Sequence, residues 1–460
     1  MSELSVVTIP LKTEIWQEDL LAKRMEIYRS IYNAMLGQVL KRYKKMISDE
    51  DYISSKKVIE DTYKITDPKE KNSVKKSQKF KDALEMQRNL FREFGFSEFS
   101  FKNESLKYAK HFKDITNTAV VTNTVATQMW RAFDKMIFGD GKMVHFKRYG
   151  QLMSLTAPAR TGIRIVDENK KTVYAMVPGQ DYFCLMSTRK GKNILMPLKI
   201  DDRDKYIMQM IQRQIHQVRI VRRDSKGKKR YLVQLIVEGT PYIKLDKNGQ
   251  EKHPVGAKAV GIYIDTTSIT LATHDGIEKI DLTMQSDLMK KKDLQRYMDA
   301  SRRAMNPDNY NEDGTIKKGR MVNGERVPLT WTYSNGYKKA SIELKEIYRK
   351  EAEKRMIRAN IIANKIIAIG SNIVINDYNF RAASRRKADP ELDDKMNYIS
   401  SKRGGSNIAN CAPAGIVAKI DTKLKMRGYE GIKKIRINTD SMIENHREVY
   451  AKFLLDKAVK

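Results

Sequence analysis

The residues of this chain that could do chemistry lie on two strand-like runs. One run is residues 260–273 (VGIYIDTTSITLAT) and the other is residues 372–378 (NIVINDY). Carboxylates on neighbouring strands can hold divalent cations that activate a water molecule and stabilise a leaving oxygen. These hard cations take oxygen ligands. Asp265 and Asp377 are the acids of the two runs, so metal chemistry at this place would depend on them.

Asp265 is the better candidate of the two. It lies two residues after Tyr263, so strand alternation puts both side chains on one face, about 6.6 Å apart along the strand. Asp377 directly follows Asn376 and is expected to point to the opposite face. Tyr263 and Asn376 are poor ligands for a hard cation. Strand alternation therefore leaves Asp265 as the candidate ligand for any cation held at this place.

Other patterns favour no further metal site or hydrolytic site. The six His residues show no ligand spacing, and no nucleophile–His–acid arrangement can be picked out. Cys184 and Cys411 are far apart, which argues against a disulfide framework and against a Cys-based zinc site. Asp440 and Glu444 are interpreted as charges at the start of a last helix, where the helix dipole favours acids.

The charge balance predicts a polyanionic partner. The 460 residues include 88 Lys and Arg against 56 Asp and Glu, a net charge of +32 that is spread along the chain. Solubility alone needs only a modest net charge, and contacts to nucleic acid would make binding steeply salt-dependent. No apolar run approaches the ~20 residues of a membrane span, and residues 1–10 lack the regions of a signal peptide. We therefore expect a cytoplasmic, nucleoid-associated protein that makes no membrane contact.

The elements that must position these residues begin with a mostly helical part. Residues 4–11 alternate as a short strand, and residues 18–45 and 117–138 carry apolar residues at helical spacing. Between them, residues 49–114 are charged and helix-prone, with breaks near residues 67–68 and Gly95.

Short strand-like runs follow residues 139–141 and favour an antiparallel sheet or small barrel. These runs are residues 164–166, 172–177, 215–222 and 230–238. Residues 224–229, between the last two runs, have hairpin-loop chemistry. Residues 243–257 form a polar stretch that we interpret as a linker and a domain boundary.

The last part alternates strands with helices, which favours an α/β sheet. A turn at residues 274–276 follows the first run, and a long helix over residues 338–369 leads to the strand 373–375. Further expected elements are a helix at 414–427, a strand at 434–437 and a helix from 440. Residues 381–407 are polar and basic.

Three further segments carry a family resemblance beside the two runs. They are MWRAFDKM at 129–136 followed by VHFKR at 144–148, the hairpin at 217–238, and RANIIANKIIAI at 358–369. In this order and spacing, the chain resembles the TnpB and compact type V-F CRISPR effector superfamily of prokaryotic RNA-guided proteins. The individual segments are short, so the weight lies in their order.

The resemblance implies a multidomain α+β fold. An antiparallel β-barrel, the wedge-like domain, would span residues 1–13 and 142–250, with a helical recognition domain inserted at residues 14–141. An RNase H-like (RuvC) α/β domain would follow over residues 251–460, with a helical insertion at about 285–370.

This chain departs from the family at the catalytic positions. Family members carry an Asp where Tyr263 stands here, and a Glu where Asn376 stands. Active relatives also carry a four-cysteine zinc ribbon and a third Asp after the strand that ends here at residue 437. Since no Cys follows Cys411, the RuvC domain is expected to lack the zinc ribbon, and the degenerate positions indicate a nuclease-dead branch.

With these departures, the resemblance implies an RNA-guided DNA-binding protein without nuclease activity. Such a protein would not be an enzyme and would need no cofactor. Such a protein would control transcription by target-site occupancy, through repression or through recruitment of a transcription factor such as a sigma factor. The implied partners are a guide RNA, double-stranded DNA with a short flanking motif, RNA polymerase or a sigma factor, and a second copy in a homodimer. Two alternatives stay open: an active RNA-guided endonuclease with displaced Mg²⁺ ligands, and an unguided basic nucleic-acid-binding protein.

Clustered basic residues are the predicted nucleic-acid contacts. They are Arg131, Lys147, Arg148, Arg222, Arg223, Lys228, Lys229, Arg230, Arg385, Arg386, Lys387, Lys402 and Arg403. Singly, each is more often part of a solvated face, but together such clusters can line a channel for an RNA–DNA heteroduplex. Aromatic residues lie beside some of them and can either stack on bases or pack in the core: Trp130, Phe146, Tyr149 and Tyr231.

Overall fold

The computed structural model of the chain describes residues 3–112, 114–139, 141, 143–188, 191–319, 321–322, 325–327, 329–384, 405–437 and 445–459. The chain divides into two compact units, Met1–Tyr242 and Ile243–Lys460. This division falls where the sequence predicts a polar linker, a few residues before the boundary expected after residue 250. Within the described ranges, no helix is both long enough and apolar enough to cross a membrane.

The first unit holds an antiparallel sheet with the strand order β1-β7-β6-β2. Its strands are β1 (Leu4–Pro10), β2 (Ser154–Pro158), β6 (Ile215–Ser225) and β7 (Lys228–Glu238). A smaller antiparallel sheet runs in the order β3-β4-β5, and its strands are β3 (Ile163–Val166), β4 (Phe183–Met186) and β5 (Ile194–Pro197). Helix α8 (Lys205–Ile211) precedes β6. An antiparallel β layer was the expectation for this region, and closure into a barrel stays a prediction.

The strand expected at residues 172–177 is wrong. Thr172 makes a single bridge to Val166, after a left-handed residue, Lys170. Val173 N still donates to Ile165 O on β3, but Met176 N donates to Ile211 O, and Tyr174 O accepts from Ile215 N. The segment is thus bonded in turn to β3 and to the ends of α8 and β6. Apolar alternation alone cannot distinguish this arrangement from a ladder.

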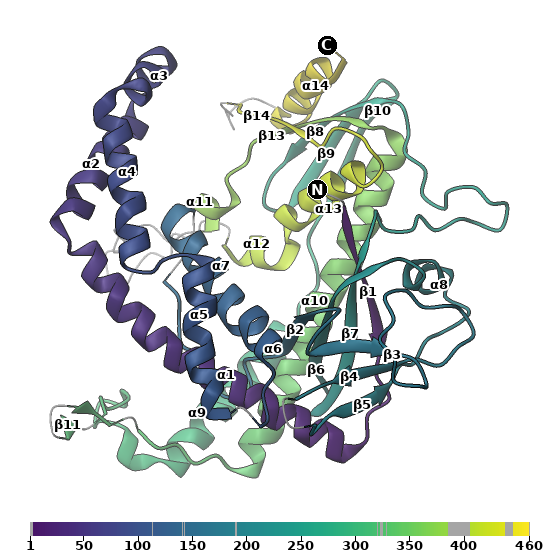
Figure 1. The fold of residues 1–460 in the computed structure, drawn as a ribbon. Coiled ribbons are helices and arrows are strands. Elements are labelled where there is room, and N and C mark those ends of the chain that lie inside the picture. Colours follow the sequence, from purple (N-terminus) through teal and green to yellow (C-terminus); the bar gives the residue numbers. More distant parts are fainter. Residues whose placement is uncertain are drawn as a thin grey trace. The chain divides into compact units, whose positions relative to one another are not determined.

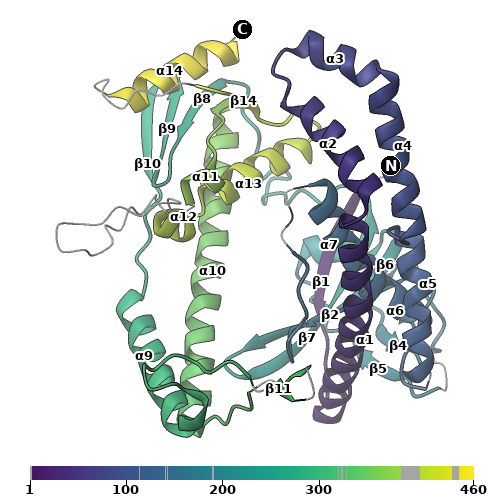
Figure 2. The same cartoon turned by 90° about the vertical axis from the view of Figure 1, so that its left-hand side faces the viewer.

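Apart from α8, the described helices of the first unit are inserted between β1 and β2 (Figures 1 and 2). They are α1 (Ile15–Ile47), α2 (Glu50–Lys64), α3 (Pro68–Lys76), α4 (Gln78–Glu93), α5 (Glu98–Ala109), η1 (Lys110–Phe112), α6 (Thr118–Val121), η2 (Thr122–Ala126) and α7 (Thr127–Phe138). The predicted breaks are confirmed. Asp67 caps α3 through Lys69 N, and Gly95 adopts φ +68° after α4. Figure 2 shows α1 as one long rod, and its buried face joins the core of the unit.

The second unit is built on a mixed sheet with the strand order β10-β9-β8-β13-β14. Its strands are β8 (Ala259–Ile264), β9 (Ser268–Thr273), β10 (Gly276–Asp281), β13 (Asn372–Asn376) and β14 (Lys433–Ile435). The first three form an antiparallel meander, whereas β13 lies parallel to both β8 and β14. The strands and the turn expected from the sequence are therefore confirmed.

The second unit also contains helices, some of which cover the two faces of the sheet. They are α9 (Leu288–Met305), η3 (Pro307–Asn309), α10 (Asn335–Ile369), α11 (Phe380–Ser384), α12 (Gly405–Cys411), α13 (Pro413–Lys425) and α14 (His446–Val459). A short ribbon, β11 (Met321–Val322) and β12 (Glu325–Arg326), lies between α9 and α10. One apolar cluster joins the sheet to α10 and α13. A second cluster, on the other face, joins it to α14.

Candidate nucleic-acid interface and degenerate carboxylate site

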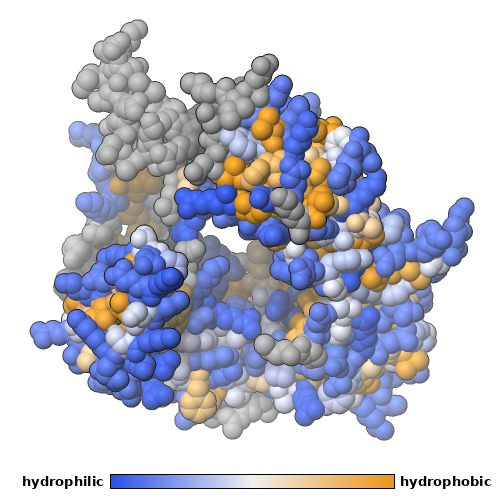
Figure 3. All heavy atoms as spheres, turned by 90° about the horizontal axis from the view of Figure 1, so that it is seen from above, coloured by the Kyte–Doolittle hydropathy of each residue, from blue (hydrophilic) through white to orange (hydrophobic). Residues whose placement is uncertain are grey.

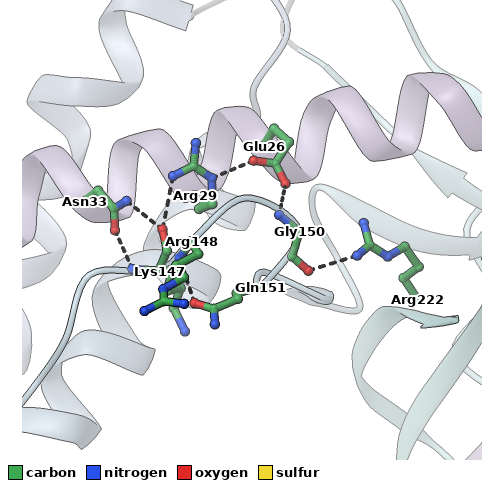
Figure 4. Close-up of polar contacts among 8 residues, drawn as sticks. All are labelled: Glu26, Arg29, Asn33, Lys147, Arg148, Gly150, Gln151 and Arg222. Atoms are coloured by element: carbon green, nitrogen blue, oxygen red, sulfur yellow. Dashed lines mark hydrogen bonds and ion pairs between the residues drawn. The ribbon is translucent and has the colours of Figure 1, made fainter. Parts of the chain in front are cut away.

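Residues 143–153, between α7 and β2, form a surface loop whose backbone is held by helix α1 (Figure 4). The amide of Asn33 pairs with both backbone groups of Lys147: Lys147 N donates to Oδ1 at 2.9 Å, and Nδ2 donates to Lys147 O at 2.8 Å. Glu26 accepts from Gly150 N at 2.7 Å. Arg29 adds a bond to Lys147 O at 3.1 Å. The loop is therefore fixed in position although it has no regular secondary structure.

Arg222 on β6 holds the other side of this loop. Its guanidinium donates to Gly150 O at 2.8 Å (Figure 4). Its backbone N donates to Met153 O at 2.8 Å. The side chain is buried and also pairs with Asp224 at 3.1 Å. Gly150 has φ +75°, a left-handed conformation that favours glycine. Arg222 was predicted to contact nucleic acid, but in the structure its guanidinium positions the loop.

The held loop presents exposed aromatic and basic side chains to solvent. Phe146 is 54% exposed and Tyr149 is 82% exposed, and Arg148 is exposed beside them. Lys147 differs, because its ammonium lies 4.7 Å from the centre of the Tyr32 ring, and partial burial lowers its pKa. Rings held out on a rigid backbone next to a cation are suited to stack on unpaired bases.

The β6–β7 hairpin ends in a tip that is rich in positive charge. Lys226 and Gly227 form the two-residue turn, both with positive φ (50° and 75°), as a type I′ turn requires. Arg223 lies opposite Arg230 in the strand register, and the flanking Lys228 and Lys229 are exposed. Like charges directly opposite one another destabilise a strand pair. A bound polyanion would remove that repulsion, so the tip is suited to contact phosphates.

The loop and the hairpin tip adjoin each other and form one continuous surface. Pairing of β2 with β6 places Ser154 opposite Val221, and the bond from Arg222 N to Met153 O continues that pairing toward the tip. We refer to residues 143–151 together with residues 223–230 as the loop–hairpin surface. The surface that Figure 3 shows is largely hydrophilic, in keeping with the net charge of the chain.

The structure does not connect the remaining predicted contacts to this surface within the residues that it describes. Arg131 is exposed on α7, and its role in binding stays a prediction. Five further predicted residues lie outside the described ranges: Arg385, Arg386, Lys387, Lys402 and Arg403. Sequence reasoning missed Glu26 and Asn33, which lie more than 110 residues before the loop they hold. Nothing in the local pattern could have found that pairing.

In the second unit, Asn376 ends β13 and is hydrogen-bonded to the backbone of β8. Ile264 N donates to Asn376 Oδ1 at 2.7 Å, and Asn376 Nδ2 donates to Ile264 O at 3.0 Å. The residue is buried, with 6% of its surface exposed. The amide extends the parallel β8–β13 pairing beyond its last backbone pair, Ile375 with Ile262. A carboxylate could accept the first bond but could not donate the second.

Asp265, the residual metal candidate, closes the β8–β9 turn. Its Oδ1 accepts from Thr267 N and Ser268 N, both at 2.7 Å, and its Oδ2 accepts from Ser268 Oγ at 3.1 Å. Arg447, at the start of α14, forms an ion pair with Oδ2 at 2.8 Å. Both carboxylate oxygens are therefore engaged within the protein. The guanidinium supplies the positive charge that a cation would otherwise bring.

Tyr263 is packed rather than poised for chemistry. It is 6% exposed, its ring stacks on Tyr450 with 5.8 Å between centroids, and it meets the edge of His446 at 6.2 Å. Burial raises the pKa of its phenol. Tyr263 and Asp265 both contact α14, as residues on one face of a strand would.

A divalent cation does not fit this donor set. The oxygen of the Asn376 amide is bonded to backbone, the Tyr263 phenol is neutral, and the Asp265 carboxylate is paired with Arg447. No group of three or more His, Cys, Asp or Glu side chains that could hold a metal exists among the described residues. Asp440 and Glu444 lie outside them.

A cavity of about 410 Å³ lies beside this edge, next to Asn376. Its lining includes Asp377, Tyr378 and Phe380 after β13, together with Asp421 and Lys425 of α13. Partial burial alone would raise the pKa of Asp421, but hydrogen bonds from Lys425 and from Ile432 N hold it below its ordinary value. Asp377 thus lines a cavity in which the other carboxylate, that of Asp421, is already paired with Lys425.

Comparisons with known proteins find similarity in structure only. No protein-family model matches the sequence, and no curated protein matches it. The chain is similar to the protein in a Cas12f1–sgRNA–target DNA complex, at 14% identity with a TM-score of 0.41, over 100% of this chain and 95% of that one. It is similar to that in a CRISPR–Cas12f ternary complex, at 13% identity and a TM-score of 0.23, over 94% and 76%.

A third similar structure is a Cas12i–crRNA complex, at 11% identity with a TM-score of 0.27, over 94% of this chain and 62% of that chain. The chain therefore spans less than two thirds of the length of that Cas12i chain. These are distant likenesses to type V CRISPR effectors, and the functional proposal rests on the residues of the two sites.

Proposed function

We propose that the protein is an RNA-guided DNA-binding protein that does not cleave DNA and that acts on transcription by occupying its target. A guide RNA supplies sequence specificity by base pairing, and the protein holds the nucleic acid through its backbone. Occupancy blocks RNA polymerase or recruits a transcription factor such as a sigma factor. The two sites are compatible with either output.

The observation that carries the loss of cleavage is the bonding of Asn376. Its amide is bonded at both ends to the backbone of Ile264, a role that requires a donor and an acceptor on one side chain. The position is thus adapted to joining two strands instead of binding a cation. Asp265 supports the same conclusion, because Arg447 neutralises the carboxylate on which a displaced metal site would depend.

Support for nucleic-acid binding comes from the loop–hairpin surface and the charge. Exposed rings on a fixed loop lie beside a hairpin tip at which Arg223 and Arg230 oppose each other. The meander followed by two parallel strands is also the sheet order expected of an RNase H-like domain. That domain assignment belongs to the proposal.

The test is to purify the protein with the RNA that it binds in its own cells and to sequence that RNA. We expect one structured RNA with a variable end, and gel-shift binding to DNA that matches the variable end. The same DNA should stay intact when Mg²⁺ or Mn²⁺ is added in saturating excess over the protein. Non-matching DNA is the control.

Two outcomes would contradict the proposal. A heterogeneous mixture of RNAs, with DNA binding that ignores sequence, would favour an unguided basic protein. Metal-dependent cutting of matched DNA that Asp265→Ala abolishes would show an active endonuclease with displaced ligands.

A further inference from the structure

The end of the α9–α10 pair that lies away from the sheet carries a group of aromatic residues to which no role has been assigned. α10 has 35 residues, and its C-terminal part packs on the sheet while its N-terminal part packs on α9. At 1.5 Å per residue, its first turn lies about 50 Å from its last. The aromatic group, which we call the α9–α10 platform, consists of Tyr297, Tyr310, Trp331, Tyr333 and Tyr337.

Side-chain amides fasten the connecting loop to the end of α9. Asn306 is buried, donates to Arg302 O and Thr332 O at 2.8 Å, and accepts from Thr332 N at 2.7 Å. Asn309 donates to Thr330 O at 2.7 Å. The residues that flank Trp331 are therefore held in place, and the platform is built on fixed backbone.

Arginine side chains lie against the rings. The guanidinium of Arg302 lies 5.5 Å from the Trp331 ring centre, and that of Arg303 lies 5.4 Å from the Tyr310 ring centre. Tyr310 and Trp331 meet edge to face at 5.8 Å. This is a cation–π arrangement that keeps positive charge at the ring surface.

The platform tyrosines are not core residues. Tyr333 stacks on Tyr337 at 4.5 Å and is still 38% exposed, while Tyr297 is 52% exposed. None of the platform rings belongs to the apolar clusters that the described residues form around the sheet. Rings that only completed a core would be buried in one of those clusters.

The charge around the platform complements phosphate. Among the side chains that the structure describes in residues 296–340, seven are Lys or Arg and four are Asp or Glu. Lys338 and Lys339 are exposed in the first turns of α10, next to Tyr337. Asp299 offsets part of this charge through its pair with Arg302 at 3.0 Å. Exposed rings with a surplus of cations suit a ligand that has both a π face and an anionic backbone.

We propose that the α9–α10 platform binds unpaired nucleobases of a single-stranded nucleic acid, with Tyr333 as the stacking ring and the neighbouring cations on the backbone. Stacking on a tyrosine is tolerant of sequence because every base has a π face. The strand comes either from unpaired guide RNA or from DNA displaced by pairing. Only the source of the strand, guide RNA or displaced DNA, rests on the proposed function. Stacking of a base on the platform needs no guide.

The test uses fluorescein-labelled 12-nucleotide oligo(U) and oligo(dT), without guide RNA, and measures their affinities by fluorescence anisotropy. We expect Tyr333→Leu to weaken binding of single strands by roughly tenfold, whereas Tyr333→Phe, which keeps the ring, stays near the wild type. Tyr429→Leu is the matched control, since Tyr429 is 42% exposed elsewhere in the same unit. A stronger effect on oligo(U) points to RNA, and one on oligo(dT) points to displaced DNA.

A blunt duplex of the same length separates stacking from phosphate contacts. Tyr333→Leu should change duplex affinity much less than single-strand affinity, because only the two terminal base pairs of the duplex expose a face. An equal loss for single strand and duplex, or single-strand affinities of Tyr333→Leu within twofold of the wild type, would overturn the platform. If oligonucleotides bind through Tyr333 but no guided DNA binding is found, the platform stands and the proposed function fails.

Discussion

Asn376→Asp is the substitution that most directly tests the reading of the degenerate site. The two side chains have the same shape, but the substitution replaces Nδ2, which lies 3.0 Å from Ile264 O, with an oxygen. A buried acceptor that loses its donor costs about 1–3 kcal/mol, and the introduced carboxylate also faces a carbonyl dipole. We therefore expect the second unit to lose about 2–4 kcal/mol at pH 7.

The loss should depend on pH with a definite sign. Protonation gives the introduced carboxyl an O–H that can donate to Ile264 O, so its pKa in the folded protein is raised above the ordinary value of about 3.9. The folded state then binds more protons than the unfolded state. Stability relative to the wild type is therefore highest below about pH 4 and falls as the pH rises through the raised pKa.

The assay combines two measurements, thermal unfolding and hydrogen exchange. Hydrogen exchange is needed because the two units need not unfold in one step, and it reports on each unit separately. A loss of this size corresponds to a drop in Tm of roughly 5–15 °C for a unit of this length. The amides of β8 and β13 should exchange faster in the variant. Asn379→Asp is the control, since Asn379 is exposed and, among the described residues, its side chain accepts from Ala382 N at 2.9 Å, a bond that Asp can also accept. Equal Tm values for Asn376→Asp and wild type at pH 7 would refute the reasoning.

Further predictions concern the loop–hairpin surface and the α9–α10 pair. Replacing both Lys229 and Arg230 by Ala should reduce the slope of log affinity against log salt by about 2, measured by gel shift at several salt concentrations; an unchanged slope would remove the tip from the interface. Tyr149→Ala should weaken single-strand binding by about 1–3 kcal/mol without lowering Tm, because the ring is 82% exposed; a lowered Tm with unchanged affinity would assign the ring a structural role instead. Glu351→Gln should destabilise the protein by about 3–5 kcal/mol at pH 7, because Lys291, 2.9 Å away and buried, loses its counter-charge. Partial burial alone would raise the pKa of Glu351, but hydrogen bonds from Lys291 and Ser286 lower it. The stability that the Lys291–Glu351 pair contributes should therefore be present above about pH 4.3 and be lost as the pH falls through the lowered pKa. A Tm difference between wild type and Glu351→Gln that did not shrink at low pH would contradict this ion pair.

Local patterns predicted the elements whose burial repeats regularly along the chain. The alternating run around Val233 and the continuous apolar run around Val260 became strands, and the helical spacing of residues 18–45 became α1. The run at 172–177 failed because its backbone bonds are made one at a time to separate neighbours. The strands β4 and β5 were not predicted at all. Being short, they give too few residues for a periodic signal.

The candidate sites show the same division. Composition led to the prediction of a polyanionic partner, and the identities of Tyr263 and Asn376 led to the prediction that cation ligands are missing; both stay predictions. The sequence also showed aromatic residues next to basic residues at 145–149, but it could not show whether these rings face solvent. Predicted contacts therefore mixed Arg148, which is exposed, with Arg222, which is buried and bonded to Gly150.

By itself, the sequence determined residue types and short-range periodicity: the charge, the hairpin turn at Lys226 and Gly227, and the absence of acids at two strand positions. Only the tertiary structure decided what those residues touch. Asn376 bonds to a residue 112 positions away, and Asn33 to one 114 positions away. Such partners are set by which backbone groups packing leaves unpaired, a property of the folded chain that no local pattern records.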